Sequence, residues 1–160
     1  MPRFSFALVV LVALTSQAWG GFQEGLAAFY RLDYQTALKE FERLAAEGDT
    51  DAQYQLGIMY YRGEGVRQDY DKARMWYRRA ADRGDTDAQL NLGLMYAQGA
   101  GVAQSFVEAF KWFELAVMYG PREDIRSKAY VNRENAASRM TKKEIERAER
   151  WAREWKPKQP

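Results

Sequence analysis

Apolar residues recur at intervals of three and four along most of the chain, which is the spacing of one face of an α-helix. Between Asp51 and Arg62 the positions with this spacing are Ala52, Leu56, Gly57, Met59 and Tyr60. Between Tyr70 and Arg83 they are Ala73, Trp76, Tyr77 and Ala80. The two segments are separated by a run with two glycines, Gly63-Glu64-Gly65-Val66, which favours a tight reversal of the chain. The pattern therefore predicts two antiparallel helices joined by a glycine loop.

This two-helix unit occurs twice. Fourteen of the 34 positions from Ala52 to Asp85 are identical 36 residues later, and the shared residues are mostly Gly, Ala and large aromatic residues. Stacked helices need this combination, because small residues let two backbones approach and large residues fill the spaces between turns. A repeat of this length indicates a solenoid, in which each repeat packs against its neighbours.

A shorter version of the unit precedes both copies. Its helix-spaced positions are Gly25, Ala28, Leu32, Tyr34, Ala37, Phe41 and Leu44. It spans 12 residues from Gly25 to Ala37, whereas the later copy spans 16 residues from Gly57 to Ala73. The loop of the first unit is therefore predicted to be four residues shorter.

The chain departs from the repeat after Gly120 and Pro121, which together end a helix. The segment from Arg122 to Ala137 can form a helix but has no glycine at the expected position. Thr141 and Glu144 form a capping-box pattern that opens a last helix, from Lys142 to Trp155. Its apolar face is Ile145, Ala148, Ala152 and Trp155, and its other face is charged. We interpret this region as a cap that closes the solenoid, with a partner-docking helix as the alternative.

The pattern A-x-x-x-L-G-x-M-Y-x-x-G-x-G-V-x-Q-x-Y-x-x-A-x-x-W-Y-x-x-A-A-x-x-G runs from Ala52 to Gly84, and a close copy ends at Gly120. It resembles the Sel-1-like repeat, a relative of the tetratricopeptide repeat with a longer loop between its helices. The resemblance implies an all-α fold, a right-handed α-solenoid of antiparallel helix pairs with roughly eight helices. The expected divisions are a signal segment (1–20), a short tetratricopeptide-like repeat (21–50), two Sel-1-like repeats (51–86 and 87–121) and capping helices (122–156).

The first 20 residues have the pattern of a secretory signal peptide. Arg3 precedes an almost wholly apolar stretch from Phe4 to Leu14, and small residues follow at Ser16, Ala18 and Gly20. The apolar stretch is shorter than the roughly 20 residues of a membrane-spanning helix. We therefore predict export, to the periplasm if the source is a Gram-negative bacterium. An uncleaved signal is the alternative, and it is the only membrane attachment that we expect.

Composition narrows the possible chemistry. The 24 Lys and Arg residues and the 22 Asp and Glu residues nearly cancel, and a net charge of +2 gives no reason to expect nucleic acid as a partner. The chain has no cysteine and no histidine, which excludes disulfides, thiol nucleophiles, Cys/His zinc sites and histidine-based triads. Acidic pairs such as Asp85 and Asp87 stand at helix starts, where carboxylates stabilise the helix dipole. We therefore expect no enzyme activity, no catalytic residue, no metal and no cofactor.

The resemblance also implies a binding groove, because the first helix of each pair lines the concave face in tetratricopeptide-type stacks. Relative to Gly25, Gly57 and Gly93, positions three before and one, four and five after should face inward. The positions selected are Phe22, Leu26, Phe29 and Tyr30, then Tyr54, Ile58, Tyr61 and Arg62, then Leu90, Leu94, Ala97 and Gln98. All of them except Phe22, Leu26 and Ala97 are candidate binding residues, nine in total. Tyrosine and arginine often dominate binding energies, whereas a packing role is the alternative for the tyrosines.

The favoured hypothesis is an exported adaptor that holds a partner protein or peptide in this groove. The alternative is an envelope protein that binds peptidoglycan or another carbohydrate, since aromatic stripes also stack on sugars. Sugar binding would need exposed aromatic residues beside polar groups, whereas peptide binding would need a continuous apolar groove. A hydrolase would need carboxylates that converge in a pocket.

Overall fold

The computed structural model describes residues 20–158, which form eight α-helices and no strand. A first helix over residues 20–30 is followed by α2 (Tyr34–Ala46), α3 (Thr50–Arg62), α4 (Tyr70–Asp82), α5 (Thr86–Gln98), α6 (Phe106–Tyr119), α7 (Glu123–Ala137) and α8 (Lys142–Glu154). In this part of the chain no helix has the length and apolar character needed to cross a membrane. The predicted signal segment, apart from Gly20, lies outside the described residues.

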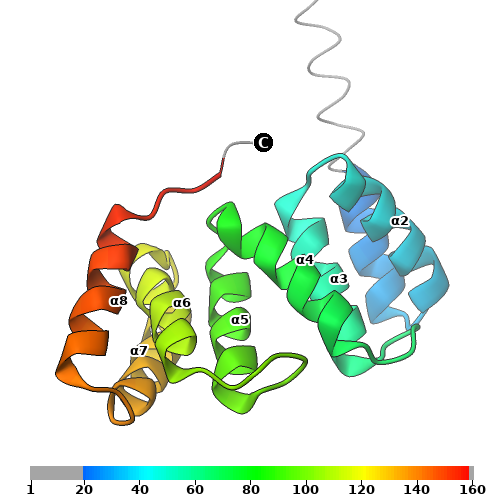
Figure 1. The fold of residues 1–160 in the computed structure, drawn as a ribbon. Coiled ribbons are helices and arrows are strands. Elements are labelled where there is room, and N and C mark those ends of the chain that lie inside the picture. Colours follow the sequence, from blue (N-terminus) through cyan, green and yellow to red (C-terminus); the bar gives the residue numbers. More distant parts are fainter. Residues whose placement is uncertain (1–19, 159–160) are drawn as a thin grey trace, which may run out of the picture.

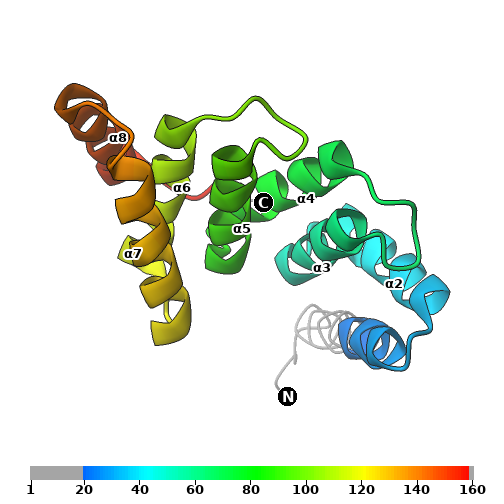
Figure 2. The same ribbon diagram turned by 90° about the horizontal axis from the view of Figure 1, so that it is seen from below.

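The helices stack as antiparallel pairs into a curved array (Figure 1). Seen from below, α3, α5 and α7 follow one side of the arc, while α2, α4 and α6 follow the other (Figure 2). The pairs α3/α4 and α5/α6 are the two copies of the repeated sequence. The predicted all-α solenoid of helix pairs is confirmed.

Helix boundaries follow from local sequence signals. The side chains of Asp49, Asp69 and Asp85 cap α3, α4 and α5 by accepting a hydrogen bond from the backbone three residues later. The helices α3 and α5 end at Gly63 and Gly99, whose φ angles of 73° and 72° lie in the left-handed region that favours glycine. The capping box predicted for α8 is also present, between Thr141 and Glu144.

Two glycines inside helices set how closely each pair packs. A Cβ atom on Gly57 would overlap the ring of Tyr77, and a Cβ atom on Gly93 would overlap the ring of Phe113. These rings belong to α4 and α6, the second helices of the same repeats. The glycines therefore allow each first helix to lie directly against an aromatic side chain of its partner.

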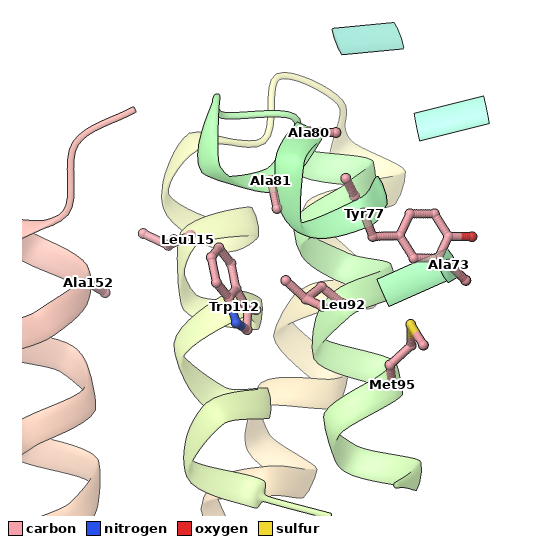
Figure 3. Close-up of a cluster of buried hydrophobic side chains, with 10 residues drawn as sticks. Ala73, Tyr77, Ala80, Ala81, Leu92, Met95, Trp112, Leu115 and Ala152 are labelled. Atoms are coloured by element: carbon pink, nitrogen blue, oxygen red, sulfur yellow. The ribbon is translucent and has the colours of Figure 1, made fainter. Parts of the chain in front are cut away.

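The buried core connects successive pairs. Trp112 of α6 packs with Leu92 of α5, and Ala152 brings α8 into the same cluster (Figure 3). The guanidinium of Arg78 lies over the Trp112 ring at 4.8 Å, so an α4 cation caps the same cluster. The core is therefore continuous across repeats, as expected for a solenoid.

The stack changes at α7. Gly57, Gly93 and Tyr130 each lie eight residues after the N-cap of their helix, so Tyr130 occupies the glycine position of the third unit. The following helix, α8, packs mainly against α6, and Tyr130 is 51% exposed.

The C-terminal tail crosses back to the middle of the array (Figure 1). Trp155 stacks on Tyr119 at 6.1 Å between ring centroids. The Lys158 backbone N–H donates to the Asp82 carbonyl at 2.7 Å, and Lys158 Nζ pairs with the Asp82 carboxylate at 2.7 Å. The tail thus joins the end of the chain to the C-terminal end of α4.

Candidate functional site

A hollow of about 200 Å³ lies between α3 and α5, on the side of the arc formed by the first helices of the pairs. It is lined by Tyr54, Ile58, Tyr61 and Arg62 of α3, Asn91 and Leu94 of α5, and Tyr77 of α4. The four α3 residues fall at helical spacings of four, three and one, so they share one face of the helix. Five of the nine candidate residues from the sequence therefore meet in one place.

Two hydrogen bonds join the helices along this hollow. Asn91 Nδ2 donates to the Tyr54 hydroxyl oxygen at 3.4 Å. The Tyr61 hydroxyl donates to Gln98 Oε1 at 3.3 Å. Tyr54 and Tyr61 also stack against Tyr77, with ring centroids 5.9 Å and 6.4 Å away. Tyr54 and Tyr61 thus connect α3 with α4 and α5, and both side chains still line the hollow.

The hollow is largely neutral. Burial, with a smaller effect of Asp87 and Asp85, raises the pKa of Tyr54 to about 12. Burial also raises the pKa of Tyr77. Both phenols therefore stay protonated at physiological pH. Arg62 is the one charged side chain among the lining residues, and it is exposed, with Glu64 3.6 Å away.

Carboxylates gather beside the groove at the N-terminal ends of α3 and α5. Burial is the main cause that raises the pKa of Asp85 to about 6, and the negative charges of Asp87 and Asp51 add to it. Burial, Asp49 and Asp87 likewise raise the pKa of Asp51. Asp87 forms an ion pair with Arg122 at 2.7 Å. Across residues 20–158, no group of acidic side chains is arranged to hold a metal ion.

The other four of the nine candidate residues do not line the hollow. Leu90 is only 7% exposed and packs in the core with residues of α6 and α7, so the expectation that it lines the groove is not met. Phe29 packs edge-on against Tyr34, and Tyr30 is exposed on the first helix; neither lines the hollow. Gln98 is exposed and meets the groove through its bond to Tyr61.

Tyr77 and Asn91 line the hollow although the sequence reasoning did not select them. Tyr77 looked like a packing residue of the second helix, and its ring does pack on Gly57. Asn91 offered a clearer signal, since it is a polar residue between Leu90 and Leu92 on a first helix. Its position, two before the glycine, was not among those assigned to the concave face.

Stacked helix hairpins with a partly aromatic hollow between their first helices define a helical-repeat solenoid. A model of the Sel1 repeat matches residues 50–85 and 86–118. The solved structure of a Sel1 repeat protein from Oxalobacter formigenes is similar, with 32% identity and a TM-score of 0.62 over 76% of this chain and 97% of that one. The chain belongs to the Sel1 repeat family.

A second solved structure is c5321, a protective antigen present in uropathogenic Escherichia coli strains that displays the same repeat fold. It is 28% identical, with a TM-score of 0.77 over 89% of this chain. This chain spans 30% of the length of that protein. No curated protein matches the chain. Sel1 repeats commonly mediate protein binding, and proteins of this family are generally not catalytic.

Proposed function

We propose that this protein is an exported adaptor that holds a segment of a partner protein in the groove between α3 and α5. The observation that carries the proposal is the hollow itself, in which Tyr54, Ile58 and Leu94 form an aromatic and aliphatic surface beside the exposed Arg62. Tyrosine and arginine around an apolar centre are the composition of binding hot spots. The family supports a scaffold role of this kind.

Site-specific photocrosslinking tests the groove. A photoreactive residue at Ile58, inside the hollow, is compared with one at Met75 on α4, which is 39% exposed and lies outside the hollow. We expect crosslinks to one defined protein from position 58 and none to it from position 75. The same products from both positions, or none from position 58, would contradict the proposal. Arg62→Ala should weaken the crosslink without unfolding the chain, because its side chain is exposed.

Export to the periplasm is the second half of the proposal. It rests on the N-terminal sequence pattern from Arg3 to Gly20. A relative described as a protective antigen is compatible with export, although this chain spans only 30% of that protein. N-terminal sequencing of protein from a Gram-negative host should find a mature chain that begins near Trp19 or Gly21. Full-length protein in the cytosolic fraction would contradict export.

Carbohydrate binding remains a second candidate because of one other hollow. Trp151 of α8 lines it together with Glu108, Lys111, Glu144 and Arg147. This combination of an aromatic ring and charged hydrogen-bonding groups suits a sugar, although Lys111 Nζ already lies 5.4 Å from the ring centroid. Co-sedimentation with insoluble peptidoglycan, lost in Arg147→Ala, would favour this candidate over the adaptor.

A further inference from the structure

A cavity of about 350 Å³ lies where the turn between α2 and α3 meets the C-terminal end of α4. It shares no residue with the groove between α3 and α5. Apart from two alanines, its lining residues are Gly48, Gln53, Arg79, Asp82, Arg83 and Lys158. We propose that this basic cavity is a second docking site, and that it takes a non-helical acidic segment of a partner protein.

The charges that line the cavity do not cancel. Asp82 is the one carboxylate among them, and both of its oxygens are engaged: Arg78 Nε lies 2.9 Å from Oδ1, and Lys158 Nζ lies 2.7 Å from Oδ2. Within residues 20–158, neither Arg79 nor Arg83 forms an ion pair with a carboxylate. Two positive charges beside the cavity are therefore left without an acidic partner in this part of the chain.

The other acidic residues of the adjoining turn already have partners. Glu47 pairs with Arg43 at 3.0 Å. The Asp49 carboxylate accepts from the Ala52 N–H at 2.8 Å and caps α3. Neither carboxylate lines the cavity. An anionic ligand would therefore meet an excess of positive charge there.

Both unpaired guanidinium groups are held in place by contacts that leave donors available. Arg83 Nη1 donates to the Gly48 carbonyl. The Arg79 guanidinium lies 4.8 Å from the Trp76 ring centroid. The two arginines are four residues apart at the end of α4, so they share one side of the helix. Their remaining N–H groups suit a carboxylate, which accepts charge-assisted hydrogen bonds.

The acceptors of the cavity are compatible with a peptide backbone. The carbonyl oxygens of Ala45 and Gly48 already accept from Gln53 Nε2 and Arg83. Gln53 is 4% exposed, and among the described residues its Oε1 has no hydrogen-bond partner. Gln89, 36 residues later, also has an unpartnered Oε1, so this atom does not distinguish the two repeats. A peptide supplies backbone N–H groups as well as a side-chain carboxylate, and so can match an acceptor beside two cations.

A non-helical segment already occupies the equivalent place of the next repeat. Gly84 lies 36 residues after Gly48, at the same position of its repeat. Pro157 and Trp155 of the C-terminal tail lie within 4.0 Å of the place that a Cβ atom on Gly84 would take. Both tail residues lie outside any helix. The turn between successive repeats therefore has a shape onto which a non-helical peptide segment fits.

One difference between the two turns indicates the charge of the ligand. At the later turn Trp155 stacks on Tyr119, with ring centroids 6.1 Å apart. The residue 36 positions before Tyr119 is Arg83. At the earlier turn a guanidinium thus replaces the aromatic ring, so we expect a carboxylate where the tail places the Trp155 indole.

An NMR titration of the isotope-labelled protein tests the proposal, with a peptide of about eight residues that alternates Thr and Glu. We expect saturable shifts of the Gly48 and Arg83 amides with a dissociation constant below about 1 mM, and at least about fivefold weaker binding of a Thr-Gln peptide of equal length. Arg79→Gln and Arg83→Gln should each weaken binding about fivefold. Arg150→Gln is the matched control, because Arg150 is exposed on α8 outside the cavity, and it should leave binding unchanged. Circular-dichroism melts establish that each variant is folded.

Three results would overturn the proposal: no saturable shift at Gly48, equal binding of the Thr-Gln peptide, or unchanged binding by folded Arg79→Gln and Arg83→Gln variants. An equal loss of binding in Arg150→Gln would also contradict it, because net charge and not the cavity would then attract the peptide. The same shifts with inorganic phosphate at equal concentration would make the cavity a small-anion site and the peptide assignment wrong. Photocrosslinking from Ile58 reports on the groove alone, so a failure at the basic cavity is distinguishable from a failure of the adaptor function.

Discussion

A single residue can have two opposing effects on the stability of this fold, and Asp85 is an example. Its carboxylate accepts a hydrogen bond from the Ala88 N–H at 2.6 Å and so caps α5. Burial and the nearby charges of Asp87 and Asp51 outweigh this hydrogen bond and raise the pKa of Asp85 to about 6. The residue that starts the helix is therefore also a source of unfavourable charge at neutral pH.

This conflict predicts a pH dependence of stability. The pKa of Asp85 is raised to about 6 in the folded protein and is about 4 in the unfolded chain. The folded state therefore binds the proton more tightly, and stability from this group is lost as the pH rises from about 4 to about 6. We expect the free energy of unfolding of the wild type, relative to Asp85→Asn, to fall by about 2–3 kcal/mol from pH 4 to pH 7.

Urea unfolding of both proteins at several pH values, followed by circular dichroism, measures the difference. Asparagine keeps the cap, so the comparison isolates the charge. A wild-type stability that runs parallel to that of Asp85→Asn over this range would contradict the assignment.

The effect on stability of a substitution at Gly57 also depends on a neighbouring residue, Tyr77. An alanine in an exposed helix position would stabilise the helix by about 1 kcal/mol relative to glycine. At Gly57 the added methyl group meets the Tyr77 ring, so we expect Gly57→Ala to destabilise the protein by about 1–3 kcal/mol. The effect should shrink in a Tyr77→Leu background, which a double-mutant cycle measures. Equal effects in both backgrounds would show that the ring is not the cause.

At the scale of helices, local signals set where each element begins and ends. The pattern predicted a helix from Asp51 to Arg62 and another from Lys142 to Trp155, and the observed bounds are Thr50–Arg62 and Lys142–Glu154. The agreement arises because caps act within a single turn. The packing of α8 against α6 was not predictable in this way, since it depends on contacts between helices that are distant in the sequence.

The contribution of the α8 capping box to stability can be tested by substitution of Thr141. The Thr141 hydroxyl accepts from the Glu144 N–H at 3.3 Å, and the Glu144 carboxylate accepts from the Thr141 N–H at 2.8 Å. Thr141→Ala should lower the free energy of unfolding by about 1 kcal/mol, whereas Thr141→Ser should be close to neutral. Thermal melts of the wild type and of the two variants measure these differences in stability. Equal melting temperatures would mean that the start of α8 contributes nothing to global stability.

At the scale of the whole molecule, the C-terminal tail adds a contact between parts of the solenoid that are distant in sequence. Repeats in a solenoid contact their neighbours, but Lys158 binds Asp82, 76 residues away in sequence. Pro157 and Trp155 cover Gly84, at the turn that joins the two Sel1 repeats. The tail therefore links the cap to the boundary between the repeats that form the groove.

Removal of this link should loosen the middle of the array. Lys158→Ala should lower stability by at most about 1 kcal/mol, because its side chain is 70% exposed. Asp82→Ala should have the larger effect, since the carboxylate is buried and also pairs with Arg78 at 2.9 Å. Hydrogen exchange should rise at the C-terminal end of α4 in both variants. Exchange that rises only in α8 would contradict a link between cap and repeats.

The repeat and the helix ends could be predicted from the amino-acid sequence, because they depend on periodicity and on contacts within a few residues. The sequence also pointed to the face of α3 on which Tyr54, Ile58 and Tyr61 meet. Only the tertiary structure decided which equivalent positions stay accessible. Tyr54 and Leu90 share one repeat position, yet Tyr54 lines the groove while Leu90 is buried among residues of α6 and α7. Exposure depends on which helix packs alongside, and local sequence does not carry that information.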